Sequence, residues 1–329
     1  MNSLGAIPAA ARAAAAAAAR AGAAAARAGV AARPAGVGIG ATDEHRTTAL
    51  MGAARYGNTA SVSALVQAGA DIEARNDFGR TALMAAAHNE HTDTIKALVQ
   101  AGANLEATDR GGMTALMYAA NNGDTDTIKA LVQAGAVIEA TNNNGFTALM
   151  RAALTGHTAS VSALVQAGAN LEATNEYGNT ALILAAFMGH TASVSALVQA
   201  GANLEATDED GATALMGAAF KGHTEAVKAL VHAGADIEAT DNNGNTALMG
   251  AAEYGKTEAV TQAIRYGKQA LIDQFQEVRD RRNAFSFARL RLNTHLQPEM
   301  LQHVVSFCLE LSEAQINMAK KYISEQSVR

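Results

Sequence analysis

Three histidines recur at intervals of 33 residues and are the first candidates for metal chemistry. They are His157, His190 and His223, and each follows a glycine. If each belongs to a separate packed unit, neighbouring rings lie about one helix-packing distance, ~10 Å, apart. Zinc binds imidazole nitrogens at ~2 Å, so these rings cannot share one ion. We therefore expect a structural role for the three histidines and no metal site.

A row of glutamates has the same period and raises the question of acid–base chemistry. The row consists of Glu73, Glu106, Glu139, Glu172, Glu205 and Glu238. A residue repeated in successive units is regular framework, whereas catalytic carboxylates converge in pairs on one site. The lone Cys308 stands five residues after His303, and this spacing alone is weak support for a nucleophile. The sequence also contains no phosphate-binding loop, zinc-ligand spacing or nucleophile elbow, so it predicts neither an enzyme nor a cofactor.

The period behind these rows runs through most of the chain. Seven threonines stand 33 residues apart, and each opens a Thr-Ala-Leu-Met/Ile-x-Ala-Ala pattern. They are Thr48, Thr81, Thr114, Thr147, Thr180, Thr213 and Thr246. A second threonine follows each of them by eleven residues, and an apolar stretch comes after it. A fixed period of this length is the signature of stacked structural repeats.

Each unit contains the signals for two short helices and a turn. We expect the first threonine to cap a helix whose apolar face holds Leu83 and Ala87 in the second unit. We expect the second threonine to cap another helix, with Leu164 on its apolar face in the fourth unit. Glycines such as Gly168 favour the left-handed conformation that ends the second helix. Glycines such as Gly156 supply the turn after the first helix, where the second unit has Glu90 instead. One helix pair cannot bury its own apolar faces, so the units must stack.

These features resemble the ankyrin repeat family, whose pattern is D-x-x-G-x-T-P-L-H-x-A-A-x-x-G-H-x-x-x-V-x-x-L-L-x-x-G-A-D-x-N-A. The resemblance covers residues 43–267. It implies an all-α solenoid of seven helix–turn–helix units with β-turn or hairpin fingers, and a concave groove that grips protein partners. Alanine replaces the family's proline, methionine or isoleucine replaces its first histidine, and glutamate replaces its late asparagine. Hydroxylation of that asparagine, which occurs in some members, is therefore not expected here.

Comparison of the seven units with one another separates framework positions from free positions. Framework positions are nearly identical, whereas the finger tips and the exposed side of the first helices vary. Eight of the nine aromatic residues within residues 43–267 fall at free positions. Because aromatic side chains dominate interface energetics, we expect a partner-binding face here. Its predicted residues are Tyr56, Phe78, Arg80, Arg110, Tyr118, Phe146, Arg151, Leu154, Tyr177, Phe187, Met188, Phe220, Lys221 and Tyr254.

Part of this face is expected to form an apolar cluster across units four to six. The members of the predicted cluster are Phe146, Leu154, Tyr177, Phe187, Met188 and Phe220. A solvent-facing cluster of this kind marks an interaction site. The alternative is that these side chains pack on one another or on the C-terminal segment.

Charge on the free positions runs from positive to negative along the chain. Units one to four carry Arg55, Arg75, Arg80, Arg110 and Arg151 against Glu44 and Asp77. Units five to seven carry Glu176, Glu209, Asp210 and Glu253 against Lys221. Such polarity sets the orientation of a partner. Residues 43–264 contain 24 acids and 11 bases, a net charge of −13, which argues against a nucleic-acid partner.

Residues 1–42 form a segment of low complexity with four arginines and no acidic residue. This composition is typical of a disordered or helical tail, and an organelle transit peptide is the alternative. The single cysteine excludes an internal disulfide and suits a reducing compartment. No apolar run reaches the ~20 residues that span a bilayer, so no membrane partner is expected. We expect a cytoplasmic protein, with an organelle, the nucleus or a host cytosol as alternatives.

Residues 268–329 do not repeat and are expected to be a helical extension. The stretch 269–282 is amphipathic and suits a cap on the last unit. The stretch from 296 resembles the opening of a truncated, PRANC-type F-box, L-P-x-E-I-L-x-x-I-x-x-x-L. The matching residues are Pro298, Met300, Leu301, Val304 and Val305. The resemblance implies binding of the adaptor Skp1, and a helical cap is again the alternative.

The sequence therefore predicts a non-enzymatic scaffold that binds a partner protein through the concave groove. The alternative is a ubiquitin-ligase substrate adaptor or host-directed effector. In that case the repeats would hold a target while residues 296–323 recruit Skp1.

Overall fold

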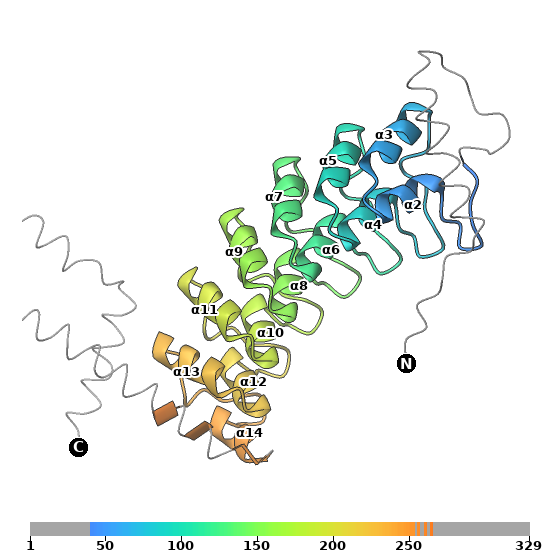
Figure 1. Ribbon diagram of the computed structural model, residues 1–329. Helices are drawn as coiled ribbons and strands as arrows, with labels where there is room; N and C mark the ends of the chain where they lie inside the picture. The colour runs from blue at the N-terminus through green and yellow to red at the C-terminus, as the bar shows by residue number, and fades with distance from the viewer. Residues whose placement is uncertain (1–39, 254, 257–259, 262–263, 266–329) are drawn as a thin grey trace, which may run out of the picture.

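The computed structural model describes residues 40–253, 255–256, 260–261 and 264–265 as an elongated array of stacked helix pairs (Figure 1). These residues contain thirteen helices, which lie in two rows. Each first-row helix packs against its neighbour in the row, and the first six also pack against their second-row partners. Finger loops project from the first row on the side away from the second row (Figure 1). The all-α solenoid predicted from the repeats is confirmed for this part of the chain.

The helices alternate regularly between the rows. The first row consists of α2 (Ala49–Arg55), α4 (Ala82–His88), α6 (Ala115–Asn122), α8 (Ala148–Thr155), α10 (Ala181–Met188), α12 (Ala214–Lys221) and α14 (Ala247–Glu253). The second row consists of α3 (Thr59–Gln67), α5 (Thr92–Gln100), α7 (Thr125–Gln133), α9 (Thr158–Gln166), α11 (Thr191–Gln199) and α13 (Thr224–Ala233). The N-terminal tail, Tyr254 and the whole of 266–329 lie outside the described residues, and with them the predicted helical extension and the F-box-like stretch.

The two threonines of each unit have different roles. The first threonine caps the first-row helix as predicted: Thr81 Oγ1 accepts a hydrogen bond from the Met84 backbone N–H at 3.4 Å. The prediction that the second threonine caps the second-row helix is wrong, because it is already helical and the residue before it is the cap. Thr59 Oγ1 instead forms a hydrogen bond with Thr94 Oγ1 of the next unit, at 2.8 Å. Its hydroxyl therefore links neighbouring units.

The histidines predicted to be structural do connect neighbouring units. His190 Nε2 lies 3.1 Å from the backbone oxygen of Leu154, and His223 Nε2 lies 3.1 Å from that of Phe187. Each ring also covers a glycine at the end of the preceding first-row helix. A Cβ placed on Gly156, for example, would come within 2.5 Å of the His190 ring. This glycine has a φ of +78°, so the turn and the ring contact both require it.

The second unit departs from this arrangement in a consistent way. Glu90 occupies the glycine position with a φ of +62°, a conformation that costs a non-glycine residue ~1–2 kcal/mol. Asp124 stands one unit later, where His91 or His190 stands in other units. A histidine ring there would compete with the Glu90 Cβ for the same space. Asp124 instead caps α7, because its Oδ1 accepts a hydrogen bond from the Thr127 N–H at 3.1 Å.

The glutamate row is a ladder of hydrogen bonds between units. Glu73 Oε1 accepts from the Asn104 N–H at 2.8 Å, and Glu106 Oε1 accepts from the Val137 N–H at the same distance. The same bond joins Glu139 to Asn170, Glu172 to Asn203 and Glu205 to Asp236. The interpretation of this row as framework is confirmed, because each of these carboxylates holds the next loop in place.

The core runs along the interior between the rows. Leu83 and Ala87 of α4 are at most 1% exposed, and Val161 and Leu164 of α9 are fully buried. Alanine at so many core positions lets the helices approach closely. The fingers are joined separately, because the Arg110 N–H donates to the Phe78 backbone oxygen at 3.0 Å and similar bonds link later fingers. The framework thus holds the free positions at regular spacing.

Candidate functional site

The candidate binding surface is the finger face, defined as the finger loops together with the outward side of the first-row helices. On each of these helices the free side chains are the fourth, seventh and eighth residues after the capping threonine. Tyr118, Asn121 and Asn122 are these three residues on α6. The finger face carries every predicted binding residue that the structure describes.

Exposure divides the predicted binding residues into groups. The exposed ones are Tyr56, Phe78, Arg110, Tyr177, Phe187, Met188 and Lys221. The half-buried ones are Arg80, Phe146, Arg151, Leu154 and Phe220. Tyr118 is buried, and Tyr254 lies outside the described residues.

Tyr118 is a structural residue, so its interpretation as part of an exposed face is wrong. It is 6% exposed, and its hydroxyl donates a hydrogen bond to Asp109 Oδ2 at 2.5 Å. The ring of His88 meets it edge-on, with 5.3 Å between ring centroids. Burial, and next the hydrogen bond to Asp109, raise the pKa of Tyr118 to about 12. For this aromatic residue the self-packing alternative is the correct one.

Arg80 lies between two aromatic rings. Its Cζ is 5.8 Å from the centroid of Phe78 on its own finger and 5.1 Å from that of Tyr118 in the next unit. Its Nε is buried without a hydrogen-bond partner and lies 3.9 Å from Asp109 Oδ2. The rest of the side chain reaches the surface, with 34% of its area exposed. Arg80 is therefore a cation held in a set position on the finger face.

His88 lies within the field of the same cations. Burial lowers its pKa, and the charges of Arg80 and then Arg55 lower it further. The neutral imidazole is therefore favoured next to Tyr118 and Arg80. The positive potential predicted for units one to three reaches the first-row helices as well as the fingers.

Arg151 and Phe146 form a second cation–aromatic pair in the fourth unit. Arg151 Cζ lies 5.9 Å from the Phe146 ring centroid, and one terminal nitrogen of Arg151 donates to Asn121 Oδ1 at 2.7 Å. Burial lowers the pKa of Arg151, and its Nε is buried without a hydrogen-bond partner. Phe146 packs partly against the core. This pair is thus built into the array.

Phe187, which is exposed, and Phe220, which is half-buried, form the aromatic pair of units five and six. Their rings stack with centroids 6.5 Å apart and planes 17° apart. Lys221 Nζ lies 4.4 Å from the Phe187 centroid and 5.3 Å from the Phe220 centroid. Met188, next to Phe187, is 44% exposed. The predicted cluster is confirmed for Phe187 and Phe220, whereas within the described residues neither Phe146 nor Tyr177 pairs ring-to-ring with them.

One geometric rule accounts for three of the contacts between free positions. The seventh position of one unit lies beside the fourth position of the next, 30 residues later. His88 meets Tyr118 in this way, and Asn121 meets Arg151. Gly217, the fourth residue of its helix, similarly lies beneath Phe187, since a Cβ there would be 3.6 Å from the Phe187 Cβ.

Sequence reasoning did not single out Asp109, His88 or Asn121 as partners of the predicted residues. Asp109 is a finger residue of a common type, and the residue types of His88 and Asn121 do not show that they face the following unit. The signal was present, because an offset of 30 residues is one 33-residue period less about one helical turn. Examining pairs at that offset would have identified His88 with Tyr118 and Asn121 with Arg151.

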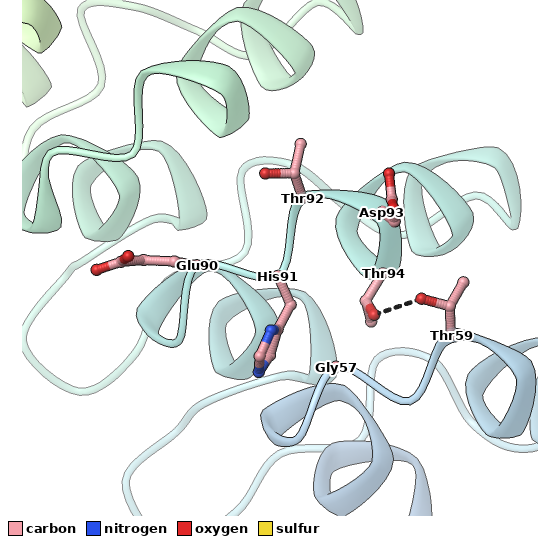
Figure 2. A pocket seen from close by; sticks show the side chains of 7 residues that line it. All are labelled: Gly57, Thr59, Glu90, His91, Thr92, Asp93 and Thr94. Carbon is pink, nitrogen blue, oxygen red and sulfur yellow. Dashed lines mark hydrogen bonds between the residues drawn. The ribbon is translucent and has the colours of Figure 1, made fainter.

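A polar hollow of about 320 Å³ lies between the first two units (Figure 2). It is lined by Gly57, Thr59, Glu90, His91, Thr92, Asp93 and Thr94. The hydroxyls of Thr59 and Thr94 hydrogen-bond to each other, as Figure 2 shows, and His91 Nε2 lies 3.0 Å from the Arg55 backbone oxygen. In the part of the chain that the structure describes, no three His, Cys, Asp or Glu side chains are grouped as in a metal site. The hollow is a joint between units.

This architecture is a tandem-repeat solenoid of the protein-binding type, because it combines regular helix pairs, fingers linked in series and a variable outer face. A family model described as "Ankyrin repeats (3 copies)" matches the chain in overlapping segments. They are residues 15–109, 50–142, 116–208, 161–241 and 197–274. The chain belongs to the ankyrin repeat family.

A solved structure supports the same assignment. The ankyrin repeat domain of Bcl-3, a member of the IkappaB protein family, is 31% identical in sequence and superposes with a TM-score of 0.58. The match covers 65% of this chain and 98% of that domain. The sequence search of curated proteins produced no match. Among the described helices, none is long and apolar enough to cross a membrane.

Proposed function

We propose that this chain is a non-enzymatic scaffold that binds a partner protein across the finger face, which is the concave side in this family. The observation that carries the proposal is the Phe187–Phe220 pair with Met188 beside it. Two aromatic rings and a flexible thioether at a solvent-facing position form an energetic anchor for an interface. Gly217 lies beneath Phe187 and has no side chain to cover it, so part of the ring is available to a partner.

The hydrogen bonds made by the rows of glutamates and histidines support a binding role over a catalytic one. Five glutamates of the ladder accept backbone hydrogen bonds from the next unit, and His91, His190 and His223 contact backbone oxygens of the preceding one. These groups are therefore committed to holding the array together. Among the side chains that vary between units, Tyr56, Phe187 and Met188 face solvent.

The proposed contact residues follow from exposure. They are Tyr56, Phe78, Arg80, Arg110, Leu154, Tyr177, Phe187, Met188, Phe220 and Lys221, with Tyr254 added from its sequence position. Tyr118 and Arg151 support this surface from below. The change from arginine-rich to acidic fingers along the array sets the orientation of the partner.

The test is a comparison of partners purified with the full-length chain and with Phe187→Ala plus Phe220→Ala, followed by mass spectrometry. A genuine partner is recovered with the wild type and lost with the double variant. The matched control is Val137→Ala, which trims an exposed apolar side chain in the loop that follows α7. Equal recovery with all three proteins would contradict the proposal.

Two sequence-based proposals concern the ends of the array. We propose that α14 opens a seventh unit, because Val260 and Ile264 that follow it are buried and helical. The proposed division is then a tail at 1–42, repeats at 43–267 and a C-terminal segment at 268–329, in a cytoplasmic protein. Limited proteolysis with mass spectrometry would check the boundaries, since cleavage should concentrate on both sides of 43–267.

The adaptor alternative depends on the F-box-like residues and has its own test. A pull-down with recombinant Skp1 should capture the wild-type chain, and Met300→Asp plus Val304→Asp should abolish capture. Failure of the wild type to bind Skp1 removes this alternative and leaves the scaffold proposal unaffected.

A further inference from the structure

We propose that the partner offers a carboxylate-rich segment to the finger face of units one to three, with Arg80 as its receptor, and an apolar side chain to Phe187 and Phe220. This inference rests on the proposed function, because it describes the partner of the same face. It adds the chemistry of that partner and the spacing of its two contact points.

Arg80 is arranged in advance for carboxylate recognition. The rings of Phe78 and Tyr118 lie 5.8 and 5.1 Å from its Cζ, and they come from two consecutive units. A planar guanidinium presents a fork that matches a carboxylate with two parallel hydrogen bonds. Because the side chain is already restrained, less conformational entropy is lost when a ligand binds.

The carboxylate nearest to Arg80 is largely committed to other donors. Asp109 Oδ2 accepts the Tyr118 hydroxyl, and Asp109 Oδ1 accepts the backbone N–H groups of Gly111 at 2.8 Å and Met113 at 2.9 Å. The Arg80 Nε lies 3.9 Å from Oδ2, which is beyond hydrogen-bond distance. Asp109 thus offsets only part of the charge of Arg80, and 34% of the Arg80 side chain remains exposed to an external acid.

The surroundings of Arg80 add further positive potential. The charges of Arg55 and Arg80 both act on His88, and Arg110 stands exposed on the following finger. Asp77 and Glu44 are the acidic residues on the first two finger tips, and Glu44 lies 3.8 Å from His45. An acidic segment is favoured at this end of the array by charge complementarity.

At units five and six, the other end of the finger face, the partner must offer a different kind of residue. Phe187, Phe220 and Met188 offer apolar area, while Glu209 and Asp210 on the neighbouring finger repel an acid. Three helix-packing steps of ~10 Å separate the Arg80–Tyr118 contact from the Phe187–Phe220 pair, and an extended chain covers ~3.3 Å per residue. The acidic cluster and the apolar anchor of the partner are therefore about nine residues apart.

Charge argues against other occupants. Residues 1–42 carry a net charge of +4 and residues 265–329 carry +3, so neither end of this chain supplies an acidic segment overall. A nucleic acid is repelled by the net charge of −13 on residues 43–264. An acidic segment of a separate protein fits both the cationic end and the aromatic end.

The probe for the test is a library of random 16-residue peptides displayed on phage and selected on the immobilised full-length chain. Four proteins are compared: the wild type, Arg80→Gln plus Arg110→Gln, Phe187→Ala plus Phe220→Ala, and the control Lys96→Gln plus Lys129→Gln. The control removes the same charge from exposed positions on the second-row helices α5 and α7. Circular dichroism melting confirms that each variant folds, and Arg110→Gln alone serves if the Arg80 change destabilises the array.

The expected result is enrichment of peptides with clustered Asp or Glu about nine residues from Leu, Phe or another large apolar residue. The arginine variant should lose the acidic preference and retain the apolar one, while the lysine control retains both. For the best peptide, fluorescence anisotropy measures the Kd. With the wild-type chain, Glu→Gln exchange in the peptide should weaken the Kd at least tenfold. With the arginine variant, the same exchange in the peptide should not weaken the Kd by this factor. Arg80→Lys should be intermediate, because it keeps the charge without the fork.

Several outcomes would overturn the inference. Peptides enriched through Phe187 and Phe220 without acidic residues would remove the carboxylate contact and leave the proposed function in place. Tenfold tighter binding of a phosphoserine peptide would reassign the ligand to a phosphopeptide, and arginine-dependent self-association in light scattering would reassign it to a second copy. The proposed function itself fails only if the Phe187 and Phe220 variant also binds peptides and purified partners as the wild type does.

Discussion

Units two and three use the same backbone positions as units five and six, yet an aromatic ring has a different fate in each region. In the first region His88 meets Tyr118 at the 30-residue offset, and the tyrosine is buried beside Arg80 and Asp109. In the second region Phe187 meets Gly217, which has no side chain, and the ring stays 39% exposed. The buried ring stands at the fourth position of its helix and the exposed ring at the seventh, so the two regions place an aromatic residue on different sides of the same stacking contact.

The largest expected difference between the two regions is the loss of unfolding free energy when the aromatic ring of each is removed. Tyr118→Ala should cost about 3 kcal/mol, because it leaves a cavity and removes the hydrogen-bond donor to Asp109 Oδ2. Phe187→Ala should cost about 1 kcal/mol or less, since its ring is partly solvated. Urea unfolding monitored by circular dichroism measures both values. Equal costs would show that the two regions are packed alike.

Asp109 tests whether the polar contacts of the first region depend on one another. Asp109→Ala should cost about 2–3 kcal/mol, because the Tyr118 hydroxyl and two backbone N–H groups lose their acceptor. The matched change is Asp208→Ala, since Asp208 accepts the same two backbone bonds in unit six. It should cost about 1 kcal/mol. Chemical denaturation of both variants measures, as the difference, the contribution of the contacts that Asp109 makes with Tyr118 and Arg80.

Glu90 is a strained backbone position within the first region. Glu90→Gly should raise stability by about 0.5–1 kcal/mol, because glycine adopts a φ of +62° without the steric cost. The opposite change in the second region, Gly189→Ala, should lower stability, since φ is +76° and the new Cβ would lie 2.5 Å from His223. Thermal melting checks both signs. A loss of stability in Glu90→Gly would indicate that Glu90 makes a compensating contact.

The smallest expected effect is the pH dependence contributed by His88. Its pKa is lowered in the folded chain, mainly by burial and then by Arg80 and Arg55, so the unfolded chain binds its proton first as pH falls. Stability from this group is present above the ordinary pKa of ~6.5 and is lost as pH falls from there through the lowered value. His88→Asn should therefore flatten the fall in stability between pH 7 and pH 5. NMR titration of the ring gives the pKa directly, and a value above the ordinary one would contradict the packing described for His88.

Much of the fold could be predicted because its signals are local and repeat seven times. Thr81 before an alanine-rich stretch predicts a capped helix, and Gly168 after an apolar stretch predicts its left-handed end, with an observed φ of +91°. The second threonine shows where local reasoning fails. Thr59 has the right residue type for a cap, but its hydroxyl bonds to Thr94 in the next unit. Local signals do not reveal such a competing partner.

The candidate site was predictable only in outline. Variation between units located the finger face, and exposure of Phe187, Met188 and Tyr177 agrees with that expectation. Tyr118 occupied an equally free position and is buried. Its environment depends on His88 and Asp109. A comparison of equivalent positions in the seven units does not show these contacts, because they join different positions.

The sequence by itself determined the helix pairs, the turns and the positions that are free to vary, because these depend on residues close together in the chain. Only the tertiary structure decided which free side chains meet, since stacking places the seventh residue of one helix beside the fourth residue of the next. That juxtaposition sets His88 against the buried Tyr118 and Gly217 beneath the exposed Phe187. The physical reason is that burial depends on which side chains an adjacent unit supplies, which the type of a residue alone does not specify.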